Sequence, residues 1–478
     1  MSNARSPREV CSTTIGTSGL TVLASFRFER SNPSDGRRPA LAPSPVKEGV
    51  LWAGTDDSRL WLTEDDGAHW DNVTPPGLRP WCKVDTIGAD PHDPASAYVA
   101  VERHQVDDFK PYVFITHDAG KHWRQAAQGI PDGDYVRVVR ADPERKGLLY
   151  AGTERGIFVS FDDGNSWQSL QRNLPTTAVR DLAVHDGDLI VGTSGRGFWI
   201  LDDIEPLREA SDSIAQNSVH LYAPKPAMRF RLGTYEGEAR PPELPHAANP
   251  PTGAVIDYWL GDGSGDAVTL IIYDAEGQQV RHFSSTDKPA AMPAPNYPDY
   301  FISPPNILPA GSGAHRFLWD LRYTPPAGAP RWGKPAVLGL TPQAPIGPLV
   351  LPGQYRVVLT VGGKEYSAPL TVQADPNAGS TPTALAANVR FALALKSDID
   401  SNVKVLQAAQ AAANASGAGR QQIEDQVKKS DLDGINRQLS MLLNEVVEND
   451  EAPSPTVVDA ANELRASSAK ARDTLKGL

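Results

Sequence analysis

A short polar stretch between residues 102 and 108 carries the side chains best suited to bind a ligand. Glu102, His104, Asp107 and Asp108 fall within seven positions. Carboxylate and imidazole groups bind divalent cations and also hydrogen-bond polar molecules. The last three could hold a divalent cation, but three such residues in this pattern do not make a metal site, and no metal is predicted. All four residues are instead predicted to contact a ligand.

These four residues belong to an insertion. From Asp90 to Thr116 is 26 positions, whereas the matching interval from Asp142 to Ser160 is 18. A polar loop that projects from a rigid scaffold is where ligands usually bind. A structural clasp between neighbouring repeats is the alternative interpretation of the insertion.

Five arginines recur near the ends of expected strands: Arg137, Arg140, Arg155, Arg180 and Arg196. They could converge on a channel, or each could pair with neighbouring Asp side chains and carbonyl groups. Arg140, Arg180 and Arg196 are retained as candidate ligand contacts.

No catalytic residue can be assigned. A glycoside hydrolase requires two carboxylates with different roles, about 5 to 10 Å apart, and a sialidase requires a tyrosine nucleophile with an arginine cluster. Neither constellation can be identified in this sequence. A Gly-rich phosphate loop, a nucleophile elbow and an HExxH motif are also missing from it. No cofactor is predicted.

The elements that position these residues are repeats. The pattern S/T-x-D-x-G-x-x-W occurs at Thr63–Trp70, Thr116–Trp123 and Ser160–Trp167. The starts are 53 and 44 positions apart, close to the roughly 40 to 50 residues of a four-stranded propeller blade. The pattern therefore predicts propeller blades, each with an Asp-box hairpin.

The chemistry of the repeated segment is that of a turn between two strands. Its Asp can accept backbone N–H groups, its Gly can adopt positive φ, and its Trp supplies a large apolar surface. An acid that recurs in every repeat cannot be a unique catalytic group, so a structural role is predicted. The residues concerned are Asp65, Gly67, Trp70, Asp118, Gly120, Trp123, Asp162, Gly164 and Trp167.

Strand patterns around these segments give four units over residues 49–205, with three, four, four and three strands. The first unit lacks a first strand, because residues 1–48 show no blade pattern and are expected to be a disordered, non-repeat segment. The fourth box has decayed to Leu201–Asp203. The prediction is a partial β-propeller, either truncated or closed by self-association of chains.

Further matching segments resemble bacterial BNR/Asp-box proteins of the sortilin (Vps10-like) type, often labelled glycosyl hydrolases. The resemblance rests on His104–Tyr112, Arg140–Glu154, Asn173–Pro175, Val179–Leu182 and Gly195–Asp203. In that family a long exported propeller precedes a sandwich domain and a helical tail. The resemblance implies that residues 49–478 correspond to the C-terminal half of such a protein, secreted or periplasmic, although no signal peptide is evident.

The rest of the chain changes character twice. Prolines accumulate over 206–251, which predicts a linker. Alternating apolar residues over 252–374 predict an Ig-like β-sandwich with a hairpin around Gly362 and Gly363. Helical spacing over 380–478 predicts an α-helical tail, either a helical hairpin or three helices. Its small apolar faces favour docking on another surface over an independent bundle, and binding of a partner is the alternative use. The fold class is therefore mainly β, with a C-terminal helical region.

Composition limits the partners. The net charge is −12 and no dense Lys/Arg run occurs, so nucleic acid is not an expected partner. No apolar run is long enough to span a membrane. The two cysteines, Cys11 and Cys82, imply neither a disulfide framework nor a zinc site. The predicted function is a non-catalytic scaffold that binds a protein, peptide or glycan; a glycoside hydrolase is the alternative.

Overall fold

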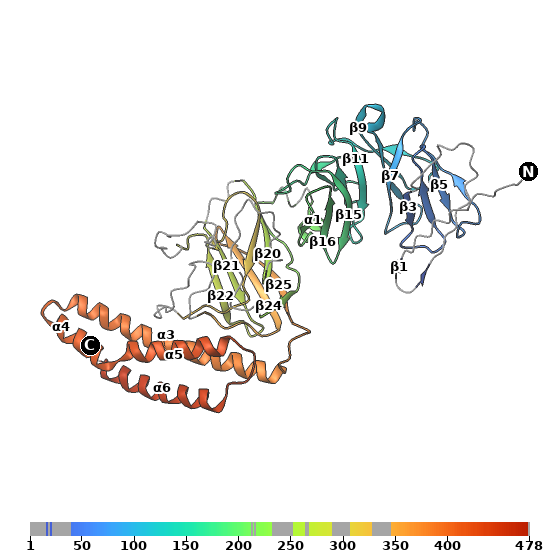
Figure 1. The fold of residues 1–478 in the computed structure, drawn as a ribbon. Coiled ribbons are helices and arrows are strands. Elements are labelled where there is room, and N and C mark those ends of the chain that lie inside the picture. Colours follow the sequence, from blue (N-terminus) through green and yellow to red (C-terminus); the bar gives the residue numbers. More distant parts are fainter. Residues whose placement is uncertain are drawn as a thin grey trace, which may run out of the picture. The chain divides into compact units, whose positions relative to one another are not determined.

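The structure is a computed structural model that describes residues 16–17, 20–21, 40–211, 214, 217–231, 252–262, 267–288, 306–326 and 346–476. It divides into two compact units, Met1–Ser211 and Asp212–Leu478. Figure 1 shows the β-rich first unit, and the sheets and helices of the second. The described part of the chain is therefore mainly β with a C-terminal helical region.

From residue 40 onward, the described part of unit 1 contains four successive antiparallel sheets, each formed by strands that follow one another in the chain. The first sheet comprises β3 (Ala40–Pro43), β4 (Leu51–Gly54), β5 (Leu60–Thr63) and β6 (Asp71–Asn72). The second comprises β7 (Lys83–Ala89), β8 (Ala97–Arg103), β9 (Asp108–Thr116) and β10 (Arg124–Gln125). The third comprises β11 (Val136–Ala141), β12 (Leu149–Thr153), β13 (Ile157–Ser160) and β14 (Gln168–Ser169). The fourth comprises β15 (Val179–His185), β16 (Asp188–Thr193) and β17 (Phe198–Leu201).

The prediction that the first of the four repeats lacks a first strand is wrong. β3 pairs with β4 from Ala40↔Gly54 to Pro43↔Leu51, which completes a four-stranded sheet. The strand ends in Pro43 and is short, so it gives little alternating pattern in the sequence. Earlier in the chain, β1 (Gly16–Thr17) and β2 (Leu20–Thr21) form a small hairpin; the other residues of 1–39 lie outside the described part, and so does the prediction of disorder there.

Neighbouring sheets contact each other through their first strands, β3 with β7, β7 with β11, and β11 with β15. An apolar cluster fills each of the three junctions. Successive four-stranded meanders joined in this way form a β-propeller-like arrangement. The short helix α1 (Glu205–Glu209) follows the fourth sheet, and its Arg208 donates to the buried Asp142.

The repeated segments form three nearly identical turns between the third and fourth strands. In the first, Asp65 Oδ1 accepts from the His69 N–H at 2.8 Å and from Thr63 Oγ1 at 2.9 Å. The hydrogen bonds from the backbone and side chain of His69 lower the pKa of Asp65 to about 2. Equivalent bonds occur around Asp118 and Asp162. The acids therefore act within the turns.

The tryptophans of two turns attach the second and third sheets to the sheet before each of them. Trp123 Nε1 donates to the Val73 carbonyl and Trp167 Nε1 to the Ala126 carbonyl, both at 2.8 Å. Gly120 must remain a glycine, because its φ is +77° and a Cβ would lie 2.6 Å from Val73.

Unit 2 begins with two sheets that share one apolar core. The three-stranded sheet has the order β18 (Val219–Leu221), β20 (Ala254–Leu260), β23 (Gly313–Trp319). The five-stranded sheet has the order β19 (Ala227–Arg229), β25 (Lys364–Ala374), β24 (Gly353–Val361), β21 (Val268–Tyr273), β22 (Gln279–Ser284). The predicted linker over 206–251 is therefore partly structured, since β18 and β19 belong to these sheets; residues 232–251 lie outside the described part.

The C-terminal helices are α3 (Pro382–Ala415), α4 (Arg420–Ser430), α5 (Leu432–Val447) and α6 (Pro455–Thr474), with a short 3-10 turn at Gly417–Gly419. Thr381 caps α3 by accepting from the Ala384 N–H at 3.2 Å, and Ser454 caps α6 in the same way. Leu395, Ile399 and Leu439 lie in a core that the helices share. The helices thus bury their apolar faces against one another in a core of their own. Among the described residues, none of the helices is long and apolar enough to cross a membrane.

A buried ion pair joins the sheets and helices of unit 2. Arg229 at the end of β19 donates through Nη1 and Nη2 to both oxygens of Asp450, at 2.9 and 2.8 Å, and Arg231 contacts the same carboxylate. Burial by itself raises the pKa of Asp450, but the hydrogen bonds from Arg229 and Arg231 outweigh it and hold the pKa well below its ordinary value. Arg229 is 4% exposed, so Asp450 is the counterion of a buried guanidinium.

We expect Asp450→Asn to lower the free energy of unfolding of unit 2 by about 3 kcal/mol at neutral pH, because a buried guanidinium loses its counterion. Urea denaturation followed by far-UV circular dichroism, which reports chiefly α3–α6, would measure it. The contribution of Asp450 is present above its ordinary pKa of 3.8 and is lost as the pH falls through the lower folded value. The free energies of unfolding of the variant and the parent should therefore converge in acid.

The exposed Asp459 on α6 provides the control, and Asp459→Asn should change stability by less than about 0.5 kcal/mol. An Asp450→Asn protein as stable as the parent at neutral pH would show that the ion pair contributes nothing net.

Candidate functional site

The candidate site lies around the connection from β8 to β9 in the second sheet. β8 ends at Arg103, a 3-10 turn covers His104–Val106, and Asp107 follows with a left-handed φ of 58° before β9 begins. The turn at Thr116–Trp123 follows the other end of β9. Because the strands are antiparallel, the candidate site and the repeated turns lie at opposite ends of the sheet.

A buried network of charges occupies one side of this connection. Glu102, whose side chain is 3% exposed, pairs with Lys83 at 2.8 Å and with Arg137 at 3.2 Å. Lys83 also pairs with Asp85 at 2.6 Å, and Arg137 with Glu154 at 2.7 Å. The five side chains come from the second and third sheets. Each carboxylate therefore has a fixed cationic partner.

Two stacked rings, those of His104 and Tyr135, contact the network. His104 stacks on Tyr135 with ring centroids 5.1 Å apart, and its Nδ1 lies 3.1 Å from Glu102. The Tyr135 hydroxyl accepts from Arg137 Nη2 at 2.6 Å. Burial, with a smaller opposing effect of Arg137, raises the pKa of Tyr135 to about 12. His104 thus fastens the loop to the third sheet, as the clasp interpretation requires.

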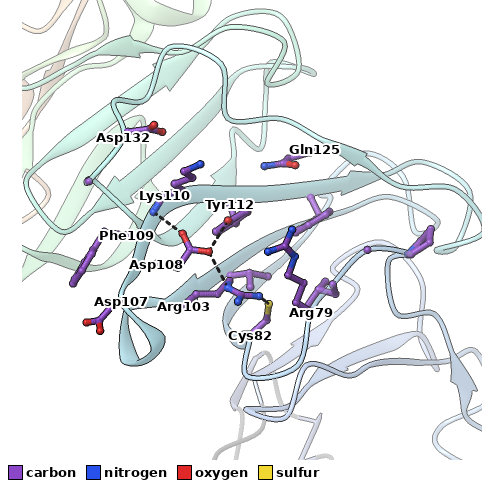
Figure 2. Close-up of a pocket in the computed structure, with 16 residues that line it drawn as sticks. Arg79, Cys82, Arg103, Asp107, Asp108, Phe109, Lys110, Tyr112, Gln125 and Asp132 are labelled. Atoms are coloured by element: carbon purple, nitrogen blue, oxygen red, sulfur yellow. Dashed lines mark hydrogen bonds and ion pairs between the residues drawn. The ribbon is translucent and has the colours of Figure 1, made fainter.

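An open pocket of about 650 Å³ lies on the other side of the connection. Figure 2 shows Asp108 in its middle, with Arg79 and Gln125 toward one side and Asp107 and Phe109 toward the other. The lining comes from the loop before β7, from β8 and β9 with their connection, from β10, and from the loop before β11. The lining residues are Pro76, Gly77, Leu78, Arg79, Cys82, Val101, Arg103, Asp107, Asp108, Phe109, Lys110, Tyr112, Phe114, Gln125, Asp132 and Gly133.

Asp108 holds the floor of the pocket in place. Its Oδ2 lies 3.0 Å from Arg103 Nε and accepts from the Tyr112 hydroxyl at 2.8 Å. Arg103 Nη1 also donates to the thiol sulfur of the buried Cys82 at 3.2 Å. Burial, together with the hydrogen bond to Asp108, raises the pKa of Tyr112. Asp108 is thus a structural acid within the pocket.

Other polar groups of the pocket are available to a ligand. Within the described part of the chain, the side chains of Arg79 and Lys110 make no hydrogen bond or ion pair, and both residues are exposed. The lining is apolar in places, because Phe109 is 45% exposed. Trp81, which precedes the lining residue Cys82 in the chain, is 71% exposed. Trp81 also has φ +66°, a conformation that costs a bulky residue energy.

The structure separates the residues that the sequence grouped together. Glu102 and His104 lie in the buried network, whereas Asp107 and Asp108 line the pocket. The cation site considered for His104, Asp107 and Asp108 does not form, since His104 faces Glu102 and Asp108 faces Arg103. Across the described ranges, no group of three His, Cys, Asp or Glu side chains could hold a metal ion.

The three candidate arginines are not brought to the pocket. Arg140 pairs with Asp181 at 2.8 Å and donates to backbone carbonyls at the junction of the third and fourth sheets. Arg180 contacts Ser194 at 3.5 Å, and Arg196 lies in the exposed turn before β17. Pairing with neighbours, the alternative considered for the arginines, describes Arg140 well.

Sequence reasoning missed Arg79 and Lys110. The available signal is the stretch 75–80, whose Pro and Gly residues indicate a surface loop that leads to Trp81. What brings that loop beside β9 is sheet pairing, which the stretch itself does not encode.

No protein-family model matches the chain, and no curated protein matches it. Three solved structures are similar in part. YCF48 bound to D1 peptide is 18% identical with a TM-score of 0.29, covering 35% of this chain and 53% of its own. YCF48 from Cyanidioschyzon merolae is 15% identical with a TM-score of 0.27, covering 36% and 54%. An ancestral GH74 enzyme is 13% identical with a TM-score of 0.28, covering 52% and 33%.

The chain thus spans about half of each YCF48 chain and a third of the GH74 enzyme. These TM-scores do not by themselves establish a fold or an activity. The description of unit 1 as propeller-like rests on its own sheets and junctions.

We expect Glu102→Gln to lower the free energy of unfolding of unit 1 by about 3 kcal/mol, because Arg137 and Lys83 lose a shared buried counterion. Chemical denaturation followed by tryptophan fluorescence would measure the change. The matched variant Glu154→Gln removes a carboxylate that is 35% exposed and should cost about 1 kcal/mol or less. If both variants lose the same free energy of unfolding, the buried Glu102 is not the main support of this loop.

Proposed function

We propose that the chain is a non-catalytic binding scaffold, in which an Asp-box propeller presents the pocket beside β9 to a peptide, protein or glycan. The observation that carries the proposal is the distribution of charge. The buried carboxylates are neutralised by Lys83 and Arg137, while the pocket leaves the cations of Arg79 and Lys110 exposed without partners among the described residues.

The pocket offers two kinds of contact. Arg79 and Lys110 are hydrogen-bond donors, suited to carboxylate, carbonyl or hydroxyl oxygens. Phe109 supplies an exposed aromatic face in the lining, and such a face binds both apolar side chains and the flat faces of other groups. A ligand with acceptor groups and an apolar portion fits this combination, as a peptide or a glycan does.

The scaffold proposal agrees with the turn chemistry. Asp65, Asp118 and Asp162 are occupied by hydrogen bonds within their own turns. The repeated turns support placing the propeller in the Asp-box group. The resemblance to the sortilin type remains part of the proposal.

A glycoside hydrolase is the alternative, and it would have to use the remaining pocket acids. Asp107 and Asp132 line the pocket and are exposed. A general acid usually lies buried in apolar surroundings, whereas both of these side chains are exposed to solvent. This difference favours binding over hydrolysis.

We expect the double variant Arg79→Ala, Lys110→Ala to bind any ligand identified on peptide and glycan arrays at least about 10-fold more weakly, since each charge-assisted hydrogen bond contributes about 1.5 kcal/mol. Isothermal titration calorimetry would measure the dissociation constants. Lys121→Ala, which removes an exposed cation in a repeated turn, should bind like the parent. If the array ligand binds the double variant unchanged, its site lies elsewhere.

The hydrolase alternative has its own assay. The purified chain should release no reducing ends from a panel of polysaccharides and aryl glycosides. If turnover is observed and is abolished in both Asp107→Asn and Asp132→Asn, the binding-scaffold proposal is wrong.

A further inference from the structure

The four sheets of unit 1 repeat one another position by position. We call the face of each sheet that packs on the following sheet its forward face, and the opposite face its backward face. Each third strand places two apolar residues on the forward face, and their partners on the second strand are also equivalent in register. The pairs are Leu60 and Leu62, Val113 and Ile115, Ile157 and Val159, and Phe198 and Ile200.

Three of these forward faces are buried and one is not. Leu60, Val113 and Ile157 are 0%, 0% and 3% exposed, whereas Phe198 at the same position is 80% exposed. At the second position Leu62, Ile115 and Val159 are 4%, 1% and 3% exposed, and Ile200 is 54% exposed. The fourth sheet therefore presents a complete forward face to solvent.

The other surroundings of the fourth sheet do not change this. Leu182, Leu189 and Val191 lie on its backward face and are buried in the junction with the third sheet. Leu207 of α1 packs into that same junction. On the forward face, cross-strand register aligns Ile190 with Ile200, and Ala183 with Ile190, in one apolar row.

The repeat also specifies what would cover such a face. At each internal junction the covering surface is a backward face with an aromatic residue on its third strand: Phe114, Phe158 or Trp199. In the first sheet Trp61 holds that position, paired with Ala53 as Phe158 is paired with Ala151. No sheet packs on this backward face in the described part of unit 1.

We propose that the forward face of the fourth sheet binds the backward face of the first sheet in a second copy of the chain. Two such contacts, related by a two-fold axis, join two sets of four sheets into one closed ring. A contact between two different surfaces forms a ring when the rotation closes, and the four sheets already share one direction of stacking. In each of the two contacts, the closed dimer buries the exposed Phe198 and Ile200 against a face that carries the half-buried Trp61.

The test is the solution mass of the full-length chain by light scattering coupled to size-exclusion chromatography. The parent should have twice the mass of one chain. Two variants should each be monomeric: the double variant Phe198→Asp, Ile200→Asp, and the single variant Trp61→Gln. An equimolar mixture of these two variants should recover a dimer, because one of its two contacts then joins two unaltered faces.

The exposed Met441 on α5, 59% exposed, provides the control, and Met441→Asp should remain dimeric. Circular dichroism and the thermal midpoint establish that the Phe198 and Ile200 variant is folded, which its surface position favours. A monomeric parent overturns the proposal. A dimer that survives the Phe198 and Ile200 substitutions, or a mixture that stays monomeric, also overturns it.

Discussion

The packing of each sheet on the next through two apolar third-strand residues is the constraint on which unit 1 depends. Hydrophobic burial is non-directional, so burial alone does not fix how one sheet lies on another. Cross-strand register within each sheet sets which side chains share a face, so that Val113 and Ile115 enter one apolar cluster with Leu149 and Ala151. The repeated turns then fasten the outer edge, where Trp123 and Trp167 donate to carbonyls of the preceding sheet. Apolar faces supply the energy, and polar turns define the geometry.

This arrangement leaves the opposite strand ends free for variation. The insertion between β8 and β9 uses that freedom twice. On one side His104 and Glu102 join the second sheet to the third through buried charges. On the other side Asp108 organises a pocket in which Arg79 and Lys110 remain accessible. A buried ion network is weak support for stability compared with apolar packing, but it holds one loop conformation, and a preformed loop loses less entropy on binding a ligand.

Unit 2 solves a different problem, the attachment of helices to sheets. The helices have a core of their own, and Asp450 in the connection before α6 adds a single strong polar contact with Arg229. Asn388 on α3 reinforces the same connection by donating to the Val446 and Glu451 carbonyls. The Arg229–Asp450 contact joins segments 221 residues apart, and the strand β19 that carries Arg229 lies within a stretch whose prolines suggested only a linker.

The sequence by itself determined the features that depend on neighbouring residues: the three turns, most strands of unit 1, the hairpin at Gly362 and the caps at Thr381 and Ser454. Turn and cap chemistry acts within about five residues, so a local pattern is sufficient. Only the tertiary structure decided which charges meet. Glu102 pairs with Arg137 rather than joining Asp107 and Asp108, because stacked sheets bring distant strands together while a local turn separates near neighbours. β3 was found only in the structure for the same reason, since its partner strand, more than its own residues, makes it a strand.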